Sequence, residues 1–190
     1  MKKIVAITSL CLFSTFSFAD WNLIQKESDF SFSSVKKAKV LESHSFNNFS
    51  GSIDEQGMAT LKLDLTSVNT GIEIRDERMQ NMLFETNKFT TATFTSKVDL
   101  NTLKTQKTGV IAQQEIQGIL NLHGVKKQIT AKLNVVKLSD SKVIVSTAEP
   151  IAINAADFAL DSGVTALKEI AKLPSISFAV PVSFNLVFSK

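Results

Sequence analysis

The segment from Glu115 to Leu138, EIQGILNLHGVKKQITAKLNVVKL, constrains the fold most, because apolar and polar residues alternate on both sides of a His-Gly pair. A period of two indicates β-strands with one apolar face, so the segment is predicted to form a β-hairpin. A register shift of one residue would turn every apolar side chain to the opposite face. The predicted apolar face consists of Ile116, Gly118, Leu120 and Leu122 before the turn, and of Ile129, Ala131, Leu133 and Val135 after it.

Shorter alternating runs fill most of the chain after residue 20. They start near Trp21, Phe30, Phe49, Leu61, Ala92 and Val143, and the longest extends from Ile176 to Phe188. Pro181 removes one backbone donor from this last run, which predicts an irregularity or an edge of the sheet there. Turn signals such as Asp54-Glu55-Gln56-Gly57 separate the runs. About eight or nine short strands at even spacing predict a closed antiparallel barrel or a sandwich.

Two segments depart from this period and are predicted to be helical. Residues 74–84, IRDERMQNMLF, place apolar side chains at helical spacing and contain no Gly or Pro. Residues 163–173, GVTALKEIAKL, form an apolar stripe, with Asp161 or Ser162 to cap its start and Pro174 to end it. No repeat, linker or low-complexity tract interrupts the chain, so residues 20–190 are predicted to form one domain.

The first 19 residues are typical of a secretory signal peptide. Lys2 and Lys3 precede an apolar segment, and Ser17-Phe18-Ala19 forms a small-x-small cleavage site. An uncleaved anchor helix is the alternative, but an apolar run of about 15 residues is short for a membrane span. We therefore expect cleavage before Asp20 and a periplasmic location. Cleavage would also remove Cys11, the only cysteine, so no disulfide is expected in the mature chain.

The charge pattern gives no indication of a nucleic-acid partner. The formal net charge falls from +3 to +1 when Lys2 and Lys3 are removed, and the other lysines are scattered along the chain. After the signal peptide, no apolar stretch is long enough to span a membrane as a helix, so stable membrane insertion is not expected.

Seven landmarks along the chain share their order and spacing with a known family. They are Trp21, Asn48-Phe49-Ser50-Gly51-Ser52-Ile53, Ser67-Val68-Asn69-Thr70-Gly71, Arg75-Asp76 with Phe84, Ala92-Thr93-Phe94-Thr95-Ser96, Gly118-Ile119-Leu120-Asn121-Leu122-His123-Gly124-Val125, and Asp157-Phe158. Together they resemble the YceI-like family of exported, lipocalin-like, lipid-binding proteins. The resemblance implies a mainly β fold, an eight-stranded antiparallel lipocalin-like β-barrel with one or two short helices near its mouth. It also implies non-enzymatic binding, transport or storage of a polyisoprenoid, an isoprenoid quinone or a fatty-acid derivative, with no cofactor.

The aromatic composition favours an apolar interior. Of the 14 phenylalanines, Phe13, Phe16 and Phe18 precede residue 20, and the remaining chain has one Trp and no Tyr. A barrel of about eight strands is either filled by its own side chains or holds one small ligand, so both interpretations apply to each Phe. The predicted tunnel lining consists of Phe30, Phe32, Phe49, Leu63, Met79, Met82, Phe84, Phe94, Leu120, Leu133, Phe158, Phe178, Val180 and Phe184.

Arg75 and Arg78 are the only arginines and lie three positions apart on the first predicted helix. Neither has a carboxylate three or four residues away along the helix, so a partner must come from elsewhere. Two interpretations stay open. The partner is either a carboxylate on a neighbouring strand or loop, or the polar or anionic head group of a ligand at the barrel mouth.

The two histidines do not suggest a metal site or catalysis. His123 is expected in the hairpin turn and His44 in solvent near the start of a strand, and neither has a second ligand at metal-binding spacing. No nucleophile elbow, P-loop or dinucleotide fingerprint occurs, so no enzymatic activity is predicted. An outer-membrane β-barrel is a weaker alternative, because a chain without Tyr and with one Trp lacks aromatic girdles. An unrecognised enzyme using the same cavity is a further alternative, and a homodimer is compatible with the sequence.

Overall fold

The structure is a computed structural model that describes residues 20–190; the predicted signal peptide, residues 1–19, lies outside the described residues. A twelve-stranded antiparallel sheet forms most of the fold. The strands are β1 (Trp21–Leu23), β2 (Asp29–Lys36), β3 (Val40–Phe46), β4 (Phe49–Ile53), β5 (Met58–Asp64), β6 (Val68–Asn69), β7 (Thr91–Lys97), β8 (Ile111–Leu122), β9 (Val125–Ser139), β10 (Lys142–Thr147), β11 (Ile151–Asn154) and β12 (Ala179–Ser189). The helices are α1 (Glu73–Arg78), α2 (Leu100–Thr105) and α3 (Asp161–Ile170), with a π-helical turn at Met79–Leu83 and 3₁₀ turns at Gln25–Glu27, Leu65–Ser67 and Ala155–Phe158.

Eight of the strands close into a barrel. Their order around the ring is β1-β4-β5-β7-β8-β9-β10-β12, and β12 pairs again with β1 to complete it. All of these pairings are antiparallel. The predicted eight-stranded antiparallel barrel is therefore confirmed.

The two halves of the long strand β12 pair with different neighbouring strands. Its C-terminal half lies between β10 and β1, where Phe188 pairs with both Val143 and Leu23. Its N-terminal half lies between β11 and β2, and the pairing with β2 starts at Val182, directly after Pro181. The register with β11 is continuous across Pro181, and the proline precedes the first residue that pairs with β2, so it lies at an edge and not at an irregularity of the sheet. Beyond β2, the sheet continues through β3 to β6.

The predicted hairpin is formed by β8 and β9. Leu122 pairs with Val125, so the turn consists of His123 and Gly124 alone, with φ angles of 52° and 77°. Positive φ at both positions is the requirement of a type I′ turn, whose twist matches that of the two strands. The register pairs Ile116 with Ala131, which puts the predicted apolar residues of both strands on the same face.

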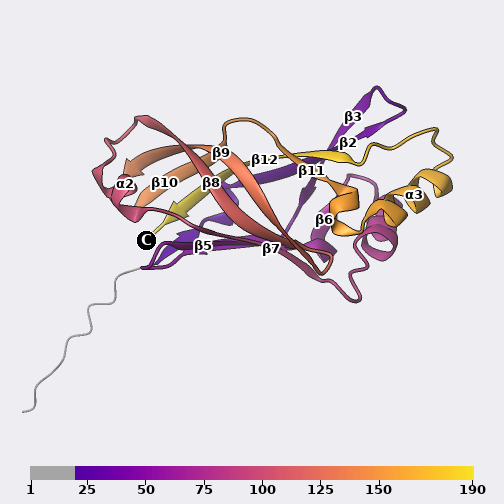
Figure 1. The fold of residues 1–190 in the computed structure, drawn as a ribbon, viewed down its shortest axis with the longest axis horizontal. Coiled ribbons are helices and arrows are strands. Elements are labelled where there is room, and N and C mark those ends of the chain that lie inside the picture. Colours follow the sequence, from indigo (N-terminus) through magenta and orange to yellow (C-terminus); the bar gives the residue numbers. More distant parts are fainter. Residues whose placement is uncertain (1–19) are drawn as a thin grey trace, which may run out of the picture.

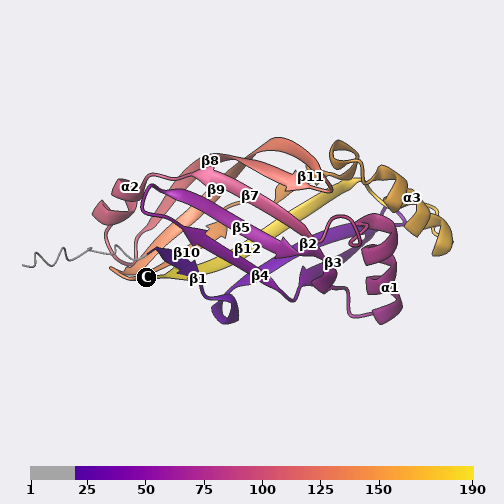
Figure 2. The same cartoon turned by 90° about the horizontal axis from the view of Figure 1, so that it is seen from below.

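The helices lie at the two ends of the elongated barrel. Figure 1 shows α3 at one end, beside the projecting β2–β3 hairpin, and α2 at the other end, near the C-terminus. Figure 2 shows that α1 lies at the same end as α3. We call these the helix end and the α2 end of the barrel. None of the helices within residues 20–190 is long and apolar enough to cross a bilayer.

The two predicted helices are present, with different bounds. The segment predicted at 74–84 consists of α1 followed by the π-helical turn, and α3 begins two residues before the predicted start, at Asp161. Helix α2 was not predicted, because it has only six residues between two strands. The side chain of Asp99 caps it by accepting a hydrogen bond from the backbone N–H of Asn101 at 2.9 Å.

Candidate functional site

A cavity of about 570 Å³ lies inside the barrel. It extends along the barrel, because Leu103 of α2 lines it at one end and Leu167 of α3 at the other. Ile170, also on α3, lines the cavity and is 46% exposed, so it lies between the cavity and the outer surface at the helix end. Its volume is within the range of ligand-binding cavities, which are mostly apolar with a few polar groups.

Ten of the apolar residues predicted to form a tunnel lining border this cavity. Alternation explains this for the eight that lie on strands, since β-strand side chains separated by two positions point to the same face. Met79 and Phe84 instead belong to the π-helical turn and its C-terminal cap. Their role in ligand binding stays a prediction. The ten residues are Phe30, Phe32, Leu63, Met79, Phe84, Phe94, Leu120, Leu133, Val180 and Phe184.

Four residues of the predicted lining do not border the cavity. Phe49 is buried in the core against the ring of Phe30, with 6.4 Å between the ring centroids. Phe158 is 1% exposed within the 3₁₀ turn that precedes α3, and Met82 is half-buried on the π-helical turn. Phe178 is 41% exposed because β12 begins only at Ala179, so the alternation does not continue back to it.

Polar side chains gather on the cavity surface at the helix end. On β2 the inward side chains change from Phe30 and Phe32 to Ser34 and Lys36 toward the hairpin tip. On β3 they change in the same direction, from Phe46 to His44 and Glu42. Arg75 of α1 lines the cavity and contacts Glu42, and Arg78, three residues further along α1, also lines it. We call Ser34, Lys36, Glu42, His44, Arg75 and Arg78 the polar cluster.

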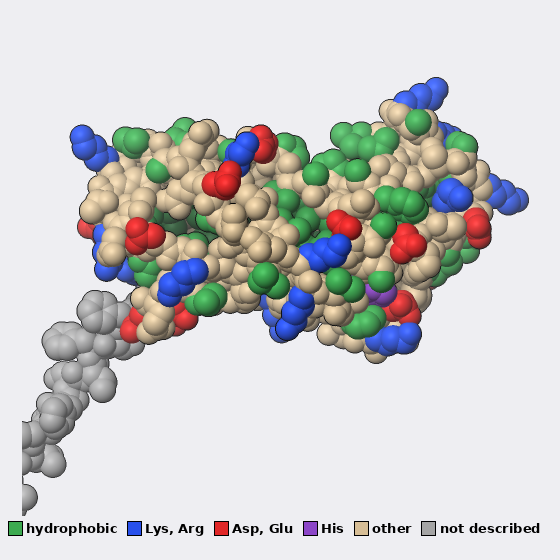
Figure 3. Space-filling model, in the orientation of Figure 1, with side chains coloured by type: hydrophobic (Ala, Val, Ile, Leu, Met, Phe, Trp, Pro, Cys, Tyr) green, Lys and Arg blue, Asp and Glu red, His purple; other side chains and the backbone are tan. Residues whose placement is uncertain are grey.

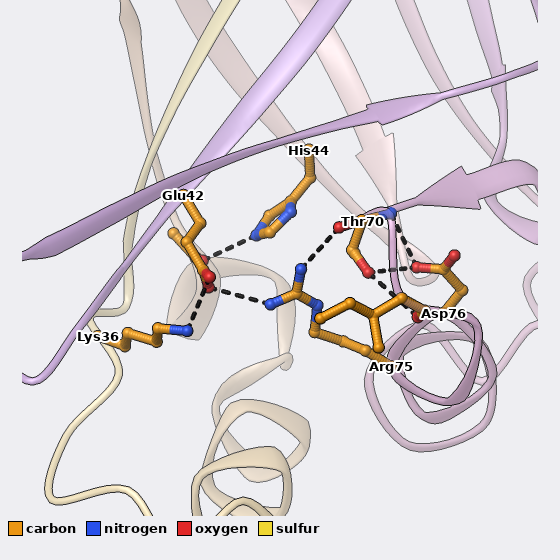
Figure 4. A network of polar contacts seen from close by, with 8 residues as sticks. Lys36, Glu42, His44, Thr70, Arg75 and Asp76 are labelled. Carbon is orange, nitrogen blue, oxygen red and sulfur yellow. Dashed lines mark hydrogen bonds and ion pairs between the residues drawn. The ribbon is translucent and has the colours of Figure 1, made fainter.

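Glu42 on β3 forms two ion pairs, one with Lys36 on β2 and one with Arg75 on α1 (Figure 4). Its Oε1 atom is 2.7 Å from Nζ of Lys36, and its Oε2 atom is 3.0 Å from Nη1 of Arg75. Nη2 of Arg75 donates a hydrogen bond of 2.7 Å to the backbone carbonyl of Thr70, whose N–H donates to Asp76. The hydrogen bond from Lys36 and the charge of Arg75 outweigh burial and lower the pKa of Glu42.

The two arginines therefore have different surroundings. Arg75 has the carboxylate on a neighbouring strand that one interpretation required, and it also lines the cavity. Arg78 lines the cavity as well but forms no ion pair with any residue in the 20–190 range. A ligand contact of either arginine stays a prediction.

His44 is not in solvent, and that expectation was wrong. It is 5% exposed, because it sits near the end of β3 with its ring turned inward against Phe32, at 5.3 Å between centroids. Its Nε2 atom lies 2.9 Å from the Ser34 hydroxyl oxygen. Burial and the nearby charge of Arg75 lower the pKa of His44, which favours the neutral imidazole.

His123 occupies the hairpin turn as expected, and it also has a structural role. Its Nε2 atom is 3.0 Å from Oε2 of Glu85, and its ring packs on Phe89 at 4.5 Å between centroids. It lies apart from the polar cluster and attaches the β8–β9 turn to the loop after the π-helical turn. Within residues 20–190, no three His, Cys, Asp or Glu side chains are grouped to hold a metal ion.

Ser34, Lys36, Glu42 and His44 were not predicted as site residues. A partial signal was present, because Ser34 and Lys36 have the same parity along their strand as Phe32, which was predicted to face inward. Glu42 and His44 share the parity of Phe46, which was not among the predicted lining residues. Lys36 and Glu42 are charged, and charged residues on strands usually face solvent. Their mutual pairing and their contact with α1 depend on contacts between separate elements.

The fold and the cavity together define a class of protein, a closed antiparallel β-barrel that encloses an apolar cavity with polar groups at one end. The chain belongs to the YceI-like family, because the model of the YceI-like domain matches residues 21–188. Among curated proteins, none gives a significant match to this chain.

Solved structures of this fold include a polyisoprenoid-binding domain from Saccharophagus degradans that is implicated in plant cell wall breakdown. It is 40% identical over 89% of this chain and 97% of its own, with a TM-score of 0.87. BcnA of Burkholderia cenocepacia is 19% identical over 87% of this chain and 98% of its own, with a TM-score of 0.66. A Campylobacter jejuni YceI protein is 20% identical over 75% and 83%, with a TM-score of 0.50. At these lower identities, the last two show the shared fold alone.

Proposed function

We propose that this protein binds one long apolar molecule, an isoprenoid or fatty-chain compound, inside the barrel and carries or stores it in the periplasm without altering it. The observation that supports the proposal most directly is the cavity of about 570 Å³ that extends along the barrel between α2 and α3. A hydrocarbon chain fits this shape better than a compact polar metabolite, because nearly all wall positions away from the helix end are aliphatic or aromatic.

Burial of such a chain would provide enough free energy for binding. Each buried CH₂ contributes about 0.8 kcal/mol, so about ten of them contribute about 8 kcal/mol. That gain is the size of the binding free energy of a complex with a Kd of about 1 μM, before the costs of association and ordering are subtracted. A longer chain gains more from burial, and the surplus that is left after those costs determines its affinity.

Similarity to the Saccharophagus degradans domain supports an isoprenoid as the ligand. That protein is described as polyisoprenoid-binding, and it is 40% identical to this chain with nearly complete coverage of both. The periplasmic location is supported by the basic residues, the apolar segment and the Ser17-Phe18-Ala19 site at the start of the sequence.

The experiment is to purify the protein from its native host and to extract it with organic solvent for mass spectrometry. A blocked variant, Ala131→Phe, places a ring in the cavity from β9, where Ala131 is 4% exposed. Its matched control, Thr130→Phe, adds the same ring one position away on the exposed face. We expect an apolar compound in the wild type and in the control, and less of it in the blocked variant.

Two results would contradict the proposal. One is a wild-type extract without any stoichiometric lipid, together with no uptake of a polyprenyl or quinone probe. The other is equal ligand content in the inward and outward variants. The location is tested separately, because recovery of the chain by osmotic shock, starting at Asp20, is expected only after export and cleavage.

A further inference from the structure

The polar cluster is unexpected in a cavity that holds only hydrocarbon. Burying polar and charged groups costs free energy unless they find partners, and aliphatic residues at these positions would extend the apolar wall. Yet Ser34, Lys36, Glu42 and His44 occupy consecutive inward positions of a single hairpin. Arg75 of α1 contacts Glu42, and Arg78, three residues along the same helix, also lines the cavity. The helix end of the cavity is therefore chemically distinct from the rest.

The charges of this cluster do not balance. Lys36, Arg75 and Arg78 line the cavity, and Glu42 is the one carboxylate among the cluster residues that does so. Asp76 lies behind them and is engaged by the backbone N–H and the hydroxyl of Thr70. The other two carboxylates of α1, Glu73 and Glu77, are exposed and do not line the cavity. The cluster groups on the cavity surface are therefore three cations and one carboxylate, and Arg78 has no ion-pair partner in the described part of the chain. Cations with low-dielectric walls around them attract an anion.

Two buried nitrogen atoms in this cluster also have no partner. Among residues 20–190, neither Nδ1 of His44 nor Nε of Arg75 makes a hydrogen bond, although neither atom is accessible to solvent. Buried donors nearly always form a hydrogen bond in native proteins. Each of these two atoms is therefore available to donate a hydrogen bond to a ligand. Figure 4 shows the His44 ring and the Arg75 guanidinium facing each other across the cluster, one from β3 and the other from α1.

We propose that the polar cluster is a head-group site for an anion, a carboxylate or a phosphate at the end of the long apolar molecule. This inference rests on the proposed function and specifies the chemical class of the ligand. Arg78 and the excess charge attract the anion, while His44 and Arg75 donate hydrogen bonds to it. The Glu42 pairs position Lys36 and Arg75, and Phe32 beside His44 begins the apolar path for the chain.

Ser34 allows a neutral His44 to act as the donor. If the Ser34 hydroxyl donates to Nε2 at 2.9 Å, the imidazole carries its proton on Nδ1, the atom without a partner. The site therefore binds an anion without first having to protonate a buried histidine. A hydrogen bond to a charged group contributes more than one between neutral groups, so the head group can decide which of several chains is preferred.

The test compares ligands that share a chain and differ in the head group. The delipidated mature protein, residues 20–190, is titrated at pH 7 with each of four ligands. Oleic acid is compared with oleyl alcohol, and geranylgeranyl phosphate is compared with geranylgeraniol. We expect each acid to bind at least about tenfold tighter than its alcohol, which is the effect of one charged hydrogen bond. The two pairs distinguish a carboxylate from a phosphate as the preferred anion.

Two variants identify the residues responsible. Arg78→Gln removes the cation that has no ion pair, and His44→Phe removes the buried donor while keeping a ring beside Phe32. Lys126→Gln, on an exposed position of β9 outside the cavity lining, controls for a general change of charge. We expect Arg78→Gln and His44→Phe each to reduce the affinity for the acid by about tenfold, while the affinity for the alcohol stays within about twofold of the wild-type value. Lys126→Gln should change neither affinity. If His44→Phe does not fold, the Arg78→Gln result decides.

The outcomes separate this inference from the proposed function. If wild-type protein binds acid and alcohol equally well, or if Arg78→Gln keeps the full preference for the acid, the anion site is refuted while the apolar cavity still functions. If no chain of either kind binds, the proposed function itself fails.

Discussion

Gly118 is the position where one added methyl group should disturb both the barrel wall and the cavity. A Cβ atom at Gly118 would lie 2.2 Å from Cζ of Phe94 and 2.6 Å from the backbone oxygen of Thr95. Since carbon atoms pack at about 3.5 Å or more, the Phe94 ring would have to move by at least about 1.3 Å. The Thr95 oxygen cannot move in the same way, because β7 is paired with β8 at this point.

We therefore expect Gly118→Ala to destabilise the protein by about 1–3 kcal/mol, the usual cost of overpacking. For a chain of this size each kcal/mol lowers Tm by about 2–4 °C, so Tm should fall by roughly 2–12 °C. Phe94 lines the cavity, so its displaced ring should also reduce ligand uptake. The measurement is thermal unfolding followed by circular dichroism, with probe binding on the same samples.

A double-mutant cycle with Phe94→Leu isolates the ring contact from the backbone contact. We expect the penalty of Gly118→Ala to be smaller in the Phe94→Leu background, because only the Thr95 contact remains. Gly51→Ala on β4 is the matched control, since its Cβ would meet its nearest neighbours at 3.2 Å and should cost less. An unchanged Tm for Gly118→Ala, or the same penalty in both backgrounds, would refute the reasoning.

Three further changes test other parts of the structure by the same unfolding measurement. Gly163→Ala should lower the free energy of unfolding by about 1–3 kcal/mol, because its Cβ would lie 2.6 Å from the Met82 carbonyl oxygen where α3 packs on the π-helical turn. The control Ser162→Ala, at an exposed position, should be nearly neutral. Equal effects of the two substitutions would contradict this packing. Ala38→Gly should stabilise by about 1 kcal/mol, because Ala38 has a φ of 55° at the β2–β3 turn; a lower Tm would count against it. The folded-state pKa of His44 lies below its ordinary value, so its contribution to stability is present above about pH 6.5 and declines as the pH falls through the folded-state pKa. The stability of wild type relative to His44→Phe should accordingly decrease on acidification, and a constant difference from pH 8 to pH 5 would disprove it.

Local patterns in the sequence were sufficient for much of the fold. The period of two along β8 and β9 predicted the apolar face, and His123-Gly124 marked the turn between them. The same alternation placed phenylalanines such as Phe30, Phe32 and Phe184 on the cavity wall. These predictions succeeded because the geometry of an extended strand alone determines which side chains share a face.

Predictions from alternation failed where strands end and where distant elements meet. The period says nothing about where a strand begins, so Phe178 was assigned to a face although β12 starts one residue later. His44 was expected in solvent because it lies in a polar stretch of sequence. Its burial depends on contacts with Phe32 and Ser34 of the neighbouring strand, which local sequence does not specify. The space-filling view shows one face of the molecule, on which hydrophobic side chains are interspersed with Lys, Arg, Asp and Glu side chains (Figure 3).

The amino-acid order was enough to establish strands with one apolar face, because side-chain direction along a strand follows from backbone geometry alone. The closure of β1 on β12, and the meeting of Lys36, Glu42 and Arg75 at one end of the cavity, came only from the folded molecule. Arg75 is 33 residues from Glu42 in the sequence, and no local pattern specifies which carboxylate a long side chain will reach. That choice depends on how the ends of the barrel are covered, which is a property of the whole chain.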